Sequence, residues 1–172
     1  MAKEVLLVDG YNIIHAWPEL KKMAMENHLD NARTRLLEIL SDYQGYKKNE
    51  IIVVFDAYKA KNPLRSIDAY HNIHVIYTKE HETADHYIEK VATEYARDYQ
   101  IRVATSDALE QTIILAKGAA RMSARELQSD IKATKKEYKA DYLENSTRTT
   151  NRLEGHLNKE TLAWMEKFRR QR

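Results

Sequence analysis

Four short apolar segments, rich in valine and isoleucine, constrain the fold of this chain more than any other feature of its sequence. They are residues 5–8, 51–55, 73–77 and 101–104, and residues 119–122 form a weaker fifth candidate. Their apolar residues run together instead of alternating with polar ones, which is typical of strands buried on both faces. A sheet of such strands is usually parallel and carries helices on each side.

Helical patterns lie between these segments, with apolar residues three or four positions apart. They cover residues 32–43, 84–99, 108–117 and 124–143. We expect Asp30 to cap the first helix and Gly45 to end it, and Thr83 and Ser123 to open the second and fourth. Strands and helices that alternate in this way predict an α/β fold with a central, mainly parallel sheet of four to five strands.

The length of 172 residues fits one domain of ordinary size. Residues 145–151 are polar and without periodicity, and a basic helix is expected over about residues 159–169. There is no cysteine, which excludes disulfide scaffolds, thiolate zinc sites and cysteine nucleophiles. No apolar segment approaches the roughly 20 residues of a membrane span, and the first is too short for a signal-peptide core. We therefore expect a soluble, cytoplasmic protein without a membrane partner.

Aspartates stand where the predicted strands end. Asp9, Asp56 and Asp107 follow three of them, and Asp85 lies in the first turn of the helix after a fourth. The carboxyl ends of parallel strands share one edge, where open α/β sheets bind their ligands. Four carboxylates at that edge would repel one another unless a cation neutralised them, and oxygen ligands favour Mg²⁺ or Mn²⁺. A shared metal site is the favoured interpretation.

Each aspartate also has a simpler interpretation. A single aspartate after a strand is usually a helix cap or a turn residue, so Asp107 could cap its helix and Asp85 could interact with the helix dipole. The first strand is followed by one glycine only, with no glycine-rich phosphate loop, so a nucleotide cofactor is not expected. A phosphatase of the haloacid dehalogenase type is disfavoured because Tyr11 stands where a second aspartate is required.

The charge is unevenly distributed. Residues 1–120 contain 15 Lys and Arg against 18 Asp and Glu, a net charge of −3, whereas residues 121–172 contain 13 against 8, a net charge of +5. This division suggests a polyanionic partner, although a solvated helical tail would have the same composition. Candidate contacts for such a partner are Tyr11, Arg33, Lys59, Lys61, Arg65, Arg121, Arg148 and Arg152.

Four motifs carry a family resemblance. They are Val-Asp-Gly-Tyr-Asn at residues 8–12, Val-Phe-Asp-Ala at 54–57, Glu-Thr-Ala-Asp at 82–85 and Ala-Thr-Ser-Asp at 104–107. In this order they resemble the motifs of NYN domains, a branch of the PIN-like nucleases, and more narrowly those of bacterial YacP-type proteins. The resemblance covers nearly the whole chain. It implies a PIN-like NYN nuclease domain over residues 1–145, with residues 146–172 belonging to the same domain.

The resemblance also implies an activity and a site. The chain would be a metal-dependent endoribonuclease, a phosphodiester hydrolase using Mg²⁺ or Mn²⁺, that acts on messenger RNA in association with the ribosome. Asp9, Asp56, Asp85 and Asp107 would bind the metal, with Asn12 and Ser106 beside them. Glu82 or Glu89 could replace or support one acid, most readily Asp56. The alternative is a catalytically silent RNA- or ribosome-binding module with the same fold.

Overall fold

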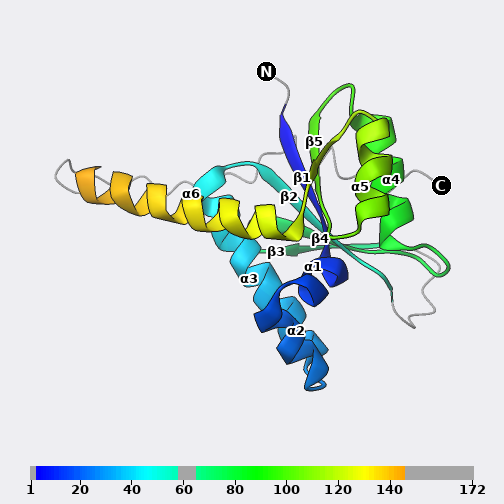
Figure 1. The fold of residues 1–172 in the computed structure, drawn as a ribbon, viewed down its shortest axis with the longest axis horizontal. Coiled ribbons are helices and arrows are strands. Elements are labelled where there is room, and N and C mark those ends of the chain that lie inside the picture. The colour runs from blue at the N-terminus through cyan, green and yellow to red at the C-terminus, as the bar shows by residue number, and fades with distance from the viewer. Residues whose placement is uncertain (1–2, 58–64, 146–172) are drawn as a thin grey trace.

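A computed structural model of the protein describes residues 3–57 and 65–145, and its core is a six-stranded sheet (Figure 1). The strands are β1 (Glu4–Asp9), β2 (Glu50–Phe55), β3 (Ser66–Tyr70), β4 (Ile73–Tyr77), β5 (Gln100–Ala104) and β6 (Ala120–Met122). They lie in the order β3-β4-β2-β1-β5-β6, and every neighbouring pair is parallel except β3 and β4. The α/β fold with a mainly parallel sheet is confirmed.

All five expected strands are present, and β3 is an additional one. It lies at the edge of the sheet, and Asp68 and Ala69 in its middle are exposed. An edge strand that is open to solvent has no need of a continuous apolar run. Its sequence, Ser-Ile-Asp-Ala-Tyr, therefore carries little of the signal that identified the buried strands.

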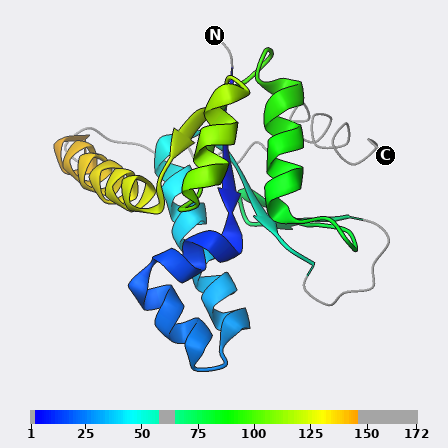
Figure 2. The ribbon, with the colours of Figure 1, turned by 45° about the vertical axis from the view of Figure 1, so that its right-hand side comes forward.

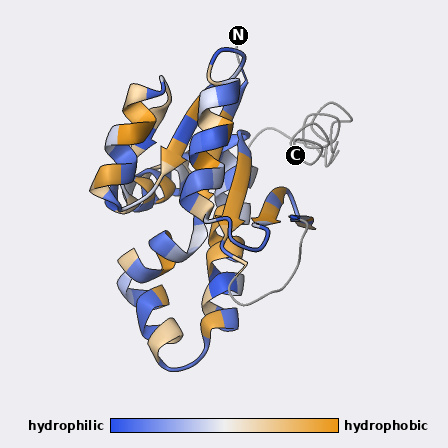
Figure 3. Ribbon diagram, turned by 90° about the vertical axis from the view of Figure 1, so that its right-hand side faces the viewer, coloured by the Kyte–Doolittle hydropathy of each residue, from blue (hydrophilic) through white to orange (hydrophobic). Residues whose placement is uncertain are grey.

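Helices cover both faces of the sheet. They are α1 (Gly10–Ala16), α2 (Pro18–Met25), α3 (Leu29–Lys47), α4 (Ala84–Tyr95), α5 (Ala108–Ala116) and α6 (Ala124–Asn145). One apolar cluster joins the sheet to α1, α2, α3 and α6, and a second joins its other face to α4 and α5. Figure 2 shows α4 and α5 standing apart from α1 and α2, and Figure 3 shows hydrophobic colour along the central strands and on parts of the helices.

The ends of α3 differ from the sequence prediction. The helix begins at Leu29, so Asp30 lies in its first turn, where the carboxylate pairs with Arg33 instead of capping a backbone amide. Gly45 lies inside the helix, which ends where Lys48 takes a left-handed conformation with φ of 61°. A glycine inside a helix costs only about 1 kcal/mol relative to alanine, so packing on the sheet overrides it.

Helices α1 and α2 are not apparent in the sequence pattern because each has at most eight residues. Trp17 separates them, and Pro18 occupies the first turn of α2, where its missing N–H has no cost. The buried indole N–H of Trp17 donates to the carbonyl oxygen of Ala124 at 2.9 Å. This bond fixes the corner between α1 and α2 against the start of α6.

Both helix openings expected from capping residues on α4 and α6 are confirmed. The hydroxyl of Thr83 accepts from the amide of His86 at 3.2 Å. At the start of α6, Ser123 and Glu126 form a reciprocal capping box, with bonds of 2.7 and 3.1 Å. Among the described helices, none is long and apolar enough to span a membrane. Asn145, the first residue of the polar segment, lies at the end of α6, and the rest of that segment and the expected basic helix lie outside the described residues.

Candidate metal centre

Three carboxylates from separate parts of the chain meet at the carboxyl edge of the sheet. Asp9 ends β1, Asp85 lies in the first turn of α4, and Glu110 lies in the first turn of α5. One carboxylate oxygen from each lies within 4.8 Å of the others. We call these residues the acid trio. No other group of three or more possible metal ligands occurs in the described part of the chain.

Asp9 is the buried member of the trio that ends a strand. Its side chain accepts from the amide of Asn12 at 3.3 Å and so also caps α1. Burial, followed by contact with Asp85 and repulsion from Glu110, raises the pKa of the Asp9 carboxyl to about 9. The residue is only 5% exposed. Without a cation, the fold therefore favours a proton on Asp9 at neutral pH.

Gly10 allows α1 to begin directly after Asp9. A Cβ atom at this position would lie 2.2 Å from the ring of Phe55, which is fully buried at the end of β2. The space beside that ring therefore admits only glycine. In the Asp-Gly pair of the first motif, the aspartate places a carboxylate at the sheet edge. The glycine lets the start of α1 lie close to the ring of Phe55.

Glu110 was not identified from the sequence. Its Oε2 atom accepts from the hydroxyl of Thr105 at 2.6 Å, and its buried Oε1 atom has no hydrogen-bond partner among the described residues. Burial, followed by repulsion from Asp85 and Asp107, raises its pKa to about 7. The available signal was its place one helical turn after Asp107, which puts a carboxylate near the same sheet edge.

Asp56 and Asp107 lie outside the acid trio and bind helix amides. The Asp56 carboxylate accepts from the amide of Ala84 at 2.5 Å, and burial raises its pKa above the ordinary value. Asp107 accepts from the amides of Leu109 and Glu110 at 2.8 and 3.3 Å. Each acid thus fixes the start of the helix that carries the next member of the trio. Asp107 is thus the N-cap of α5, as its simpler interpretation from the sequence proposed.

Asn12 and Ser106 lie together beside the trio. The side-chain oxygen of Asn12 accepts from the amide of Ser106 at 2.5 Å and from its hydroxyl at 2.6 Å. These bonds join α1 to the loop between β5 and α5, which are 94 residues apart in the chain. They fix the two segments that carry Asp9 and Glu110 relative to each other.

The other acids considered at the sequence level are engaged elsewhere. Glu82 forms a largely buried ion pair with Arg65, with 2.6 Å between its Oε2 atom and Nε of the arginine. The Arg65 guanidinium also lies over the ring of Tyr87, with 4.8 Å to its centroid. Glu89 lies 3.9 Å from the ammonium of Lys117. The side chain of Arg65, a candidate RNA contact, is 8% exposed in this pairing.

Of the remaining basic candidates, the structure describes Arg33 and Arg121. Arg33 donates to the hydroxyl of Tyr11 at 3.0 Å, and Arg121, which is exposed, donates to Gln111 at 3.0 Å. Four others lie outside the described residues: Lys59, Lys61, Arg148 and Arg152. The structure therefore places Arg33 and Tyr11 together near the carboxyl edge.

The residues of the trio fit a hard divalent cation. All three donors are carboxylate oxygens, and one of them, Oε1 of Glu110, is buried without a partner among the described residues. A cation would satisfy that oxygen and stabilise the charged forms of Asp9 and Glu110 against the burial and the repulsion that raise their pKa values. Asp85 is exposed, which leaves one side of the trio open to solvent.

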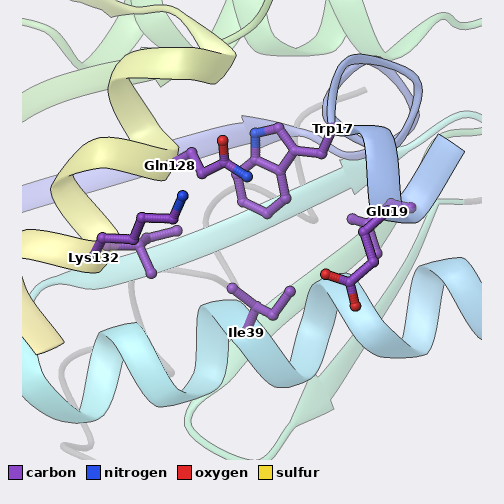
Figure 4. Close-up of a pocket in the computed structure, with 7 residues that line it drawn as sticks. Trp17, Glu19, Ile39, Gln128 and Lys132 are labelled. Carbon is purple, nitrogen blue, oxygen red and sulfur yellow. The ribbon is translucent and has the colours of Figure 1, made fainter.

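A separate cavity of about 160 Å³ lies between the α1–α2 corner, α3 and α6 (Figure 4). Its lining is largely apolar and includes Trp17, Ile39 and Ile131, with Lys132 and Glu19 beside them. No member of the acid trio lines it. The cavity is therefore not part of the candidate metal centre.

Comparison with known families defines the class of protein. The profile of the YacP-like NYN domain family matches residues 6–170, and NYN domains have a PIN-like nuclease fold. The chain therefore belongs to the YacP-like NYN family.

Named relatives place it more closely. The chain is 42% identical to YacP of Bacillus subtilis strain 168, described as an uncharacterized protein, over 97% of both sequences. It is also similar to two crystal structures of Rae1 (YacP) from B. subtilis. The W164L mutant has a TM-score of 0.70 and 40% identity over 86% of each chain. The other has a TM-score of 0.63 and 38% identity over 96% of this chain and 94% of that one.

Proposed function

We propose that the protein is a metal-dependent endoribonuclease that hydrolyses phosphodiester bonds in RNA. The observation that carries this proposal is the acid trio, in which a buried glutamate oxygen has no partner among the described residues. A module that only binds RNA gains nothing from three clustered carboxylates, because they repel the phosphate backbone. Membership of a family with a PIN-like nuclease fold supports the same activity.

In this proposal Asp9, Asp85 and Glu110 hold Mg²⁺ or Mn²⁺. When bound, such a cation lowers the pKa of a coordinated water and polarises the phosphate. Asp56 and Asp107 position the helices that carry two of the ligands. This assignment adds Glu110 to the four aspartates expected from the sequence and gives two of them a positioning role. The open side at Asp85 is where the phosphodiester approaches.

The substrate is proposed to be messenger RNA bound to the ribosome. The positive charge of residues 121–172 would attract the phosphate backbone. Arg33, Tyr11 and the exposed Arg121 are the described residues that we propose for RNA contact. The cytoplasm follows as the proposed location, because translating ribosomes are the site of action.

The test is cleavage of messenger RNA during translation in vitro, with Mg²⁺ or Mn²⁺ present. The parent protein is compared with Asp9→Asn, Asp85→Asn and Glu110→Gln. Asp98→Asn is the matched control, because Asp98 is exposed beyond the end of α4 that lies away from the trio. A defined cut that the three substitutions remove, and that the control keeps, supports the proposal. Binding of RNA or ribosomes without any cut by the parent protein would instead establish the silent binding module.

A further inference from the structure

Three aromatic side chains form a row along the carboxyl edge of the sheet. Tyr11 and Phe55 have ring centroids 4.9 Å apart at 59°, and Phe55 stacks on Tyr77 with 5.7 Å between centroids and 24° between planes. Phe55 is fully buried, whereas Tyr11 and Tyr77 are partly exposed. We call these three residues the aromatic row. In this row the two tyrosines are accessible to solvent, and the buried ring of Phe55 packs between them.

The aromatic row is next to the acid trio. Tyr11 follows Asp9 by two positions, which limits the distance between their Cα atoms to about 7 Å. Phe55 and Asp56 are consecutive at the end of β2 and face opposite sides of the sheet, because side chains alternate along a strand. Phe55 packs in the cluster of α3, while Asp56 binds the start of α4. The row therefore continues the carboxyl edge from β1 toward β4.

Arg33 on α3 adds a cation to this row. Its guanidinium donates to the Tyr11 hydroxyl at 3.0 Å and pairs with the exposed carboxylate of Asp30. These are its two partners within the described part of the chain, so three of its five N–H groups remain for a ligand. The Asp30 side chain is 86% exposed, and exposed ion pairs of this kind contribute little energy. A phosphate could replace the Asp30 carboxylate at small cost.

We propose that the aromatic row and Arg33 form a subsite for one nucleotide of single-stranded RNA, next to the phosphodiester at the acid trio. The base contacts Tyr11 and Tyr77, and its phosphate binds Arg33. Partly exposed aromatic rings beside a guanidinium match the two parts of a nucleotide, an aromatic base and an anion. A base in a duplex has no free face, so the strand must be unpaired here. This inference rests on the proposed function and specifies how the substrate is held.

The experiment separates base from phosphate by measuring binding without cleavage. The probe is a fluorescein-labelled oligouridylate of about eight nucleotides, and the comparison probe has the same ribose-phosphate chain without bases. Binding is measured in EDTA for the parent and for Tyr77→Leu, Tyr77→Phe and Arg33→Met. The controls are Arg35→Met, which lies on α3 and contacts Glu19 and Glu38, and Tyr138→Leu on α6. Thermal unfolding of each variant is recorded alongside.

The expected results differ by variant. Tyr77→Leu weakens binding of the oligouridylate about tenfold and leaves the abasic probe unchanged, because only a base can stack on the ring. Tyr77→Phe restores the binding. Arg33→Met weakens binding of both probes about five- to tenfold, and the effect declines as salt is raised.

Other patterns overturn the inference. They are equal weakening of both probes by Tyr77→Leu, an effect of Arg33→Met no larger than that of Arg35→Met, or absence of oligouridylate binding by the parent protein. Because the measurement needs no metal or turnover, it is independent of the cleavage test. Absence of cleavage by the parent would contradict the nuclease proposal while leaving this subsite in place.

Discussion

The two edges of the central sheet treat acidic side chains differently. At the amino edge, Glu50 pairs with Lys3 at 2.8 Å, and Glu4 lies 3.6 Å from Arg102. At the carboxyl edge, the acid trio has no basic partner within the described residues. The two acids at the amino edge thus have basic partners, whereas the acid trio at the carboxyl edge is left for a cation or protons. The acid trio is therefore the group of carboxylates among the described residues that could hold a metal ion.

The largest effect that we predict is a difference in RNA cleavage between substitutions at the two edges. Glu110→Gln keeps the shape of the side chain and removes a proposed ligand, so RNA cleavage falls at least about 100-fold. Glu50→Gln at the amino edge loses its ion pair with Lys3, at the opposite edge from the trio, and keeps full activity. Initial rates on the same RNA check both. Equal activities for the two variants would remove the distinction between the edges.

The second prediction concerns pH and metal removal. Because the pKa of Asp9 is raised from 3.8 to about 9 in the fold, the folded state binds more protons than the unfolded state across that range. The Asp9 contribution to the stability of the metal-free protein is therefore fully present below its unfolded pKa of 3.8 and is lost as pH rises toward 9. Glu110, with its pKa raised to about 7, adds to the decline.

Urea unfolding in EDTA at pH 5, 7 and 9 measures this decline, and Asp9→Asn should make it shallower. Adding Mg²⁺ or Mn²⁺ at pH 8 to about 100 times its dissociation constant should raise the free energy of unfolding by about 2.7 kcal/mol. Asp98→Asn should behave as the parent does. A free energy of unfolding that rises with pH in EDTA, or that does not change when metal is added, would contradict this prediction.

Two glycines, one near each edge, give the third prediction. Gly10→Ala drives a Cβ atom into the buried ring of Phe55 and destabilises the protein by about 1–3 kcal/mol. Gly45, inside α3, has only the Asn72 side chain near it, at 3.9 Å. Gly45→Ala should therefore stabilise the helix by roughly 0.5–1 kcal/mol. Urea unfolding of the two variants should give changes of opposite sign.

The fourth prediction separates a metal ligand from a residue that only positions one. Asp107→Asn keeps a side-chain acceptor for the helix amides, so stability and most activity remain. Asp107→Ala removes the cap, costs about 1 kcal/mol, and displaces Glu110 enough to lower metal affinity 10- to 100-fold. Titration of Mn²⁺ into each variant measures this effect. A complete loss of metal binding in Asp107→Asn would show that Asp107 itself is a ligand.

How far the fold could be read from the sequence depended on burial. The buried strands β1, β2, β4 and β5 have a continuous apolar pattern that can be recognised in the sequence. Thr83 and Ser123 cap their helices as expected. The edge strand β3 leaves no such pattern. The predicted end of α3 at Gly45 was wrong, because packing on the sheet extends the helix through this glycine despite its low helix propensity.

The site was partly predictable for a similar reason. Asp9 was identifiable because it directly follows a buried strand, and parallel strands bring such residues to one edge. Glu110 lies one turn inside a helix, so its spacing from Asp107 indicates the edge of the sheet, and the packing of α5 brings its carboxylate to the trio. Arg65 could not be assigned from sequence, because its partners Glu82 and Tyr87 come from elements folded against it.

The most direct test of the central claim is anomalous diffraction from crystals of the parent protein soaked in Mn²⁺, with Glu110→Gln treated in the same way. The proposed metal centre predicts an anomalous peak between the carboxylates of Asp9, Asp85 and Glu110 in the parent, and its loss or marked weakening in the variant. A parent protein with no manganese among these three carboxylates, at a concentration that supports RNA cleavage, would contradict it.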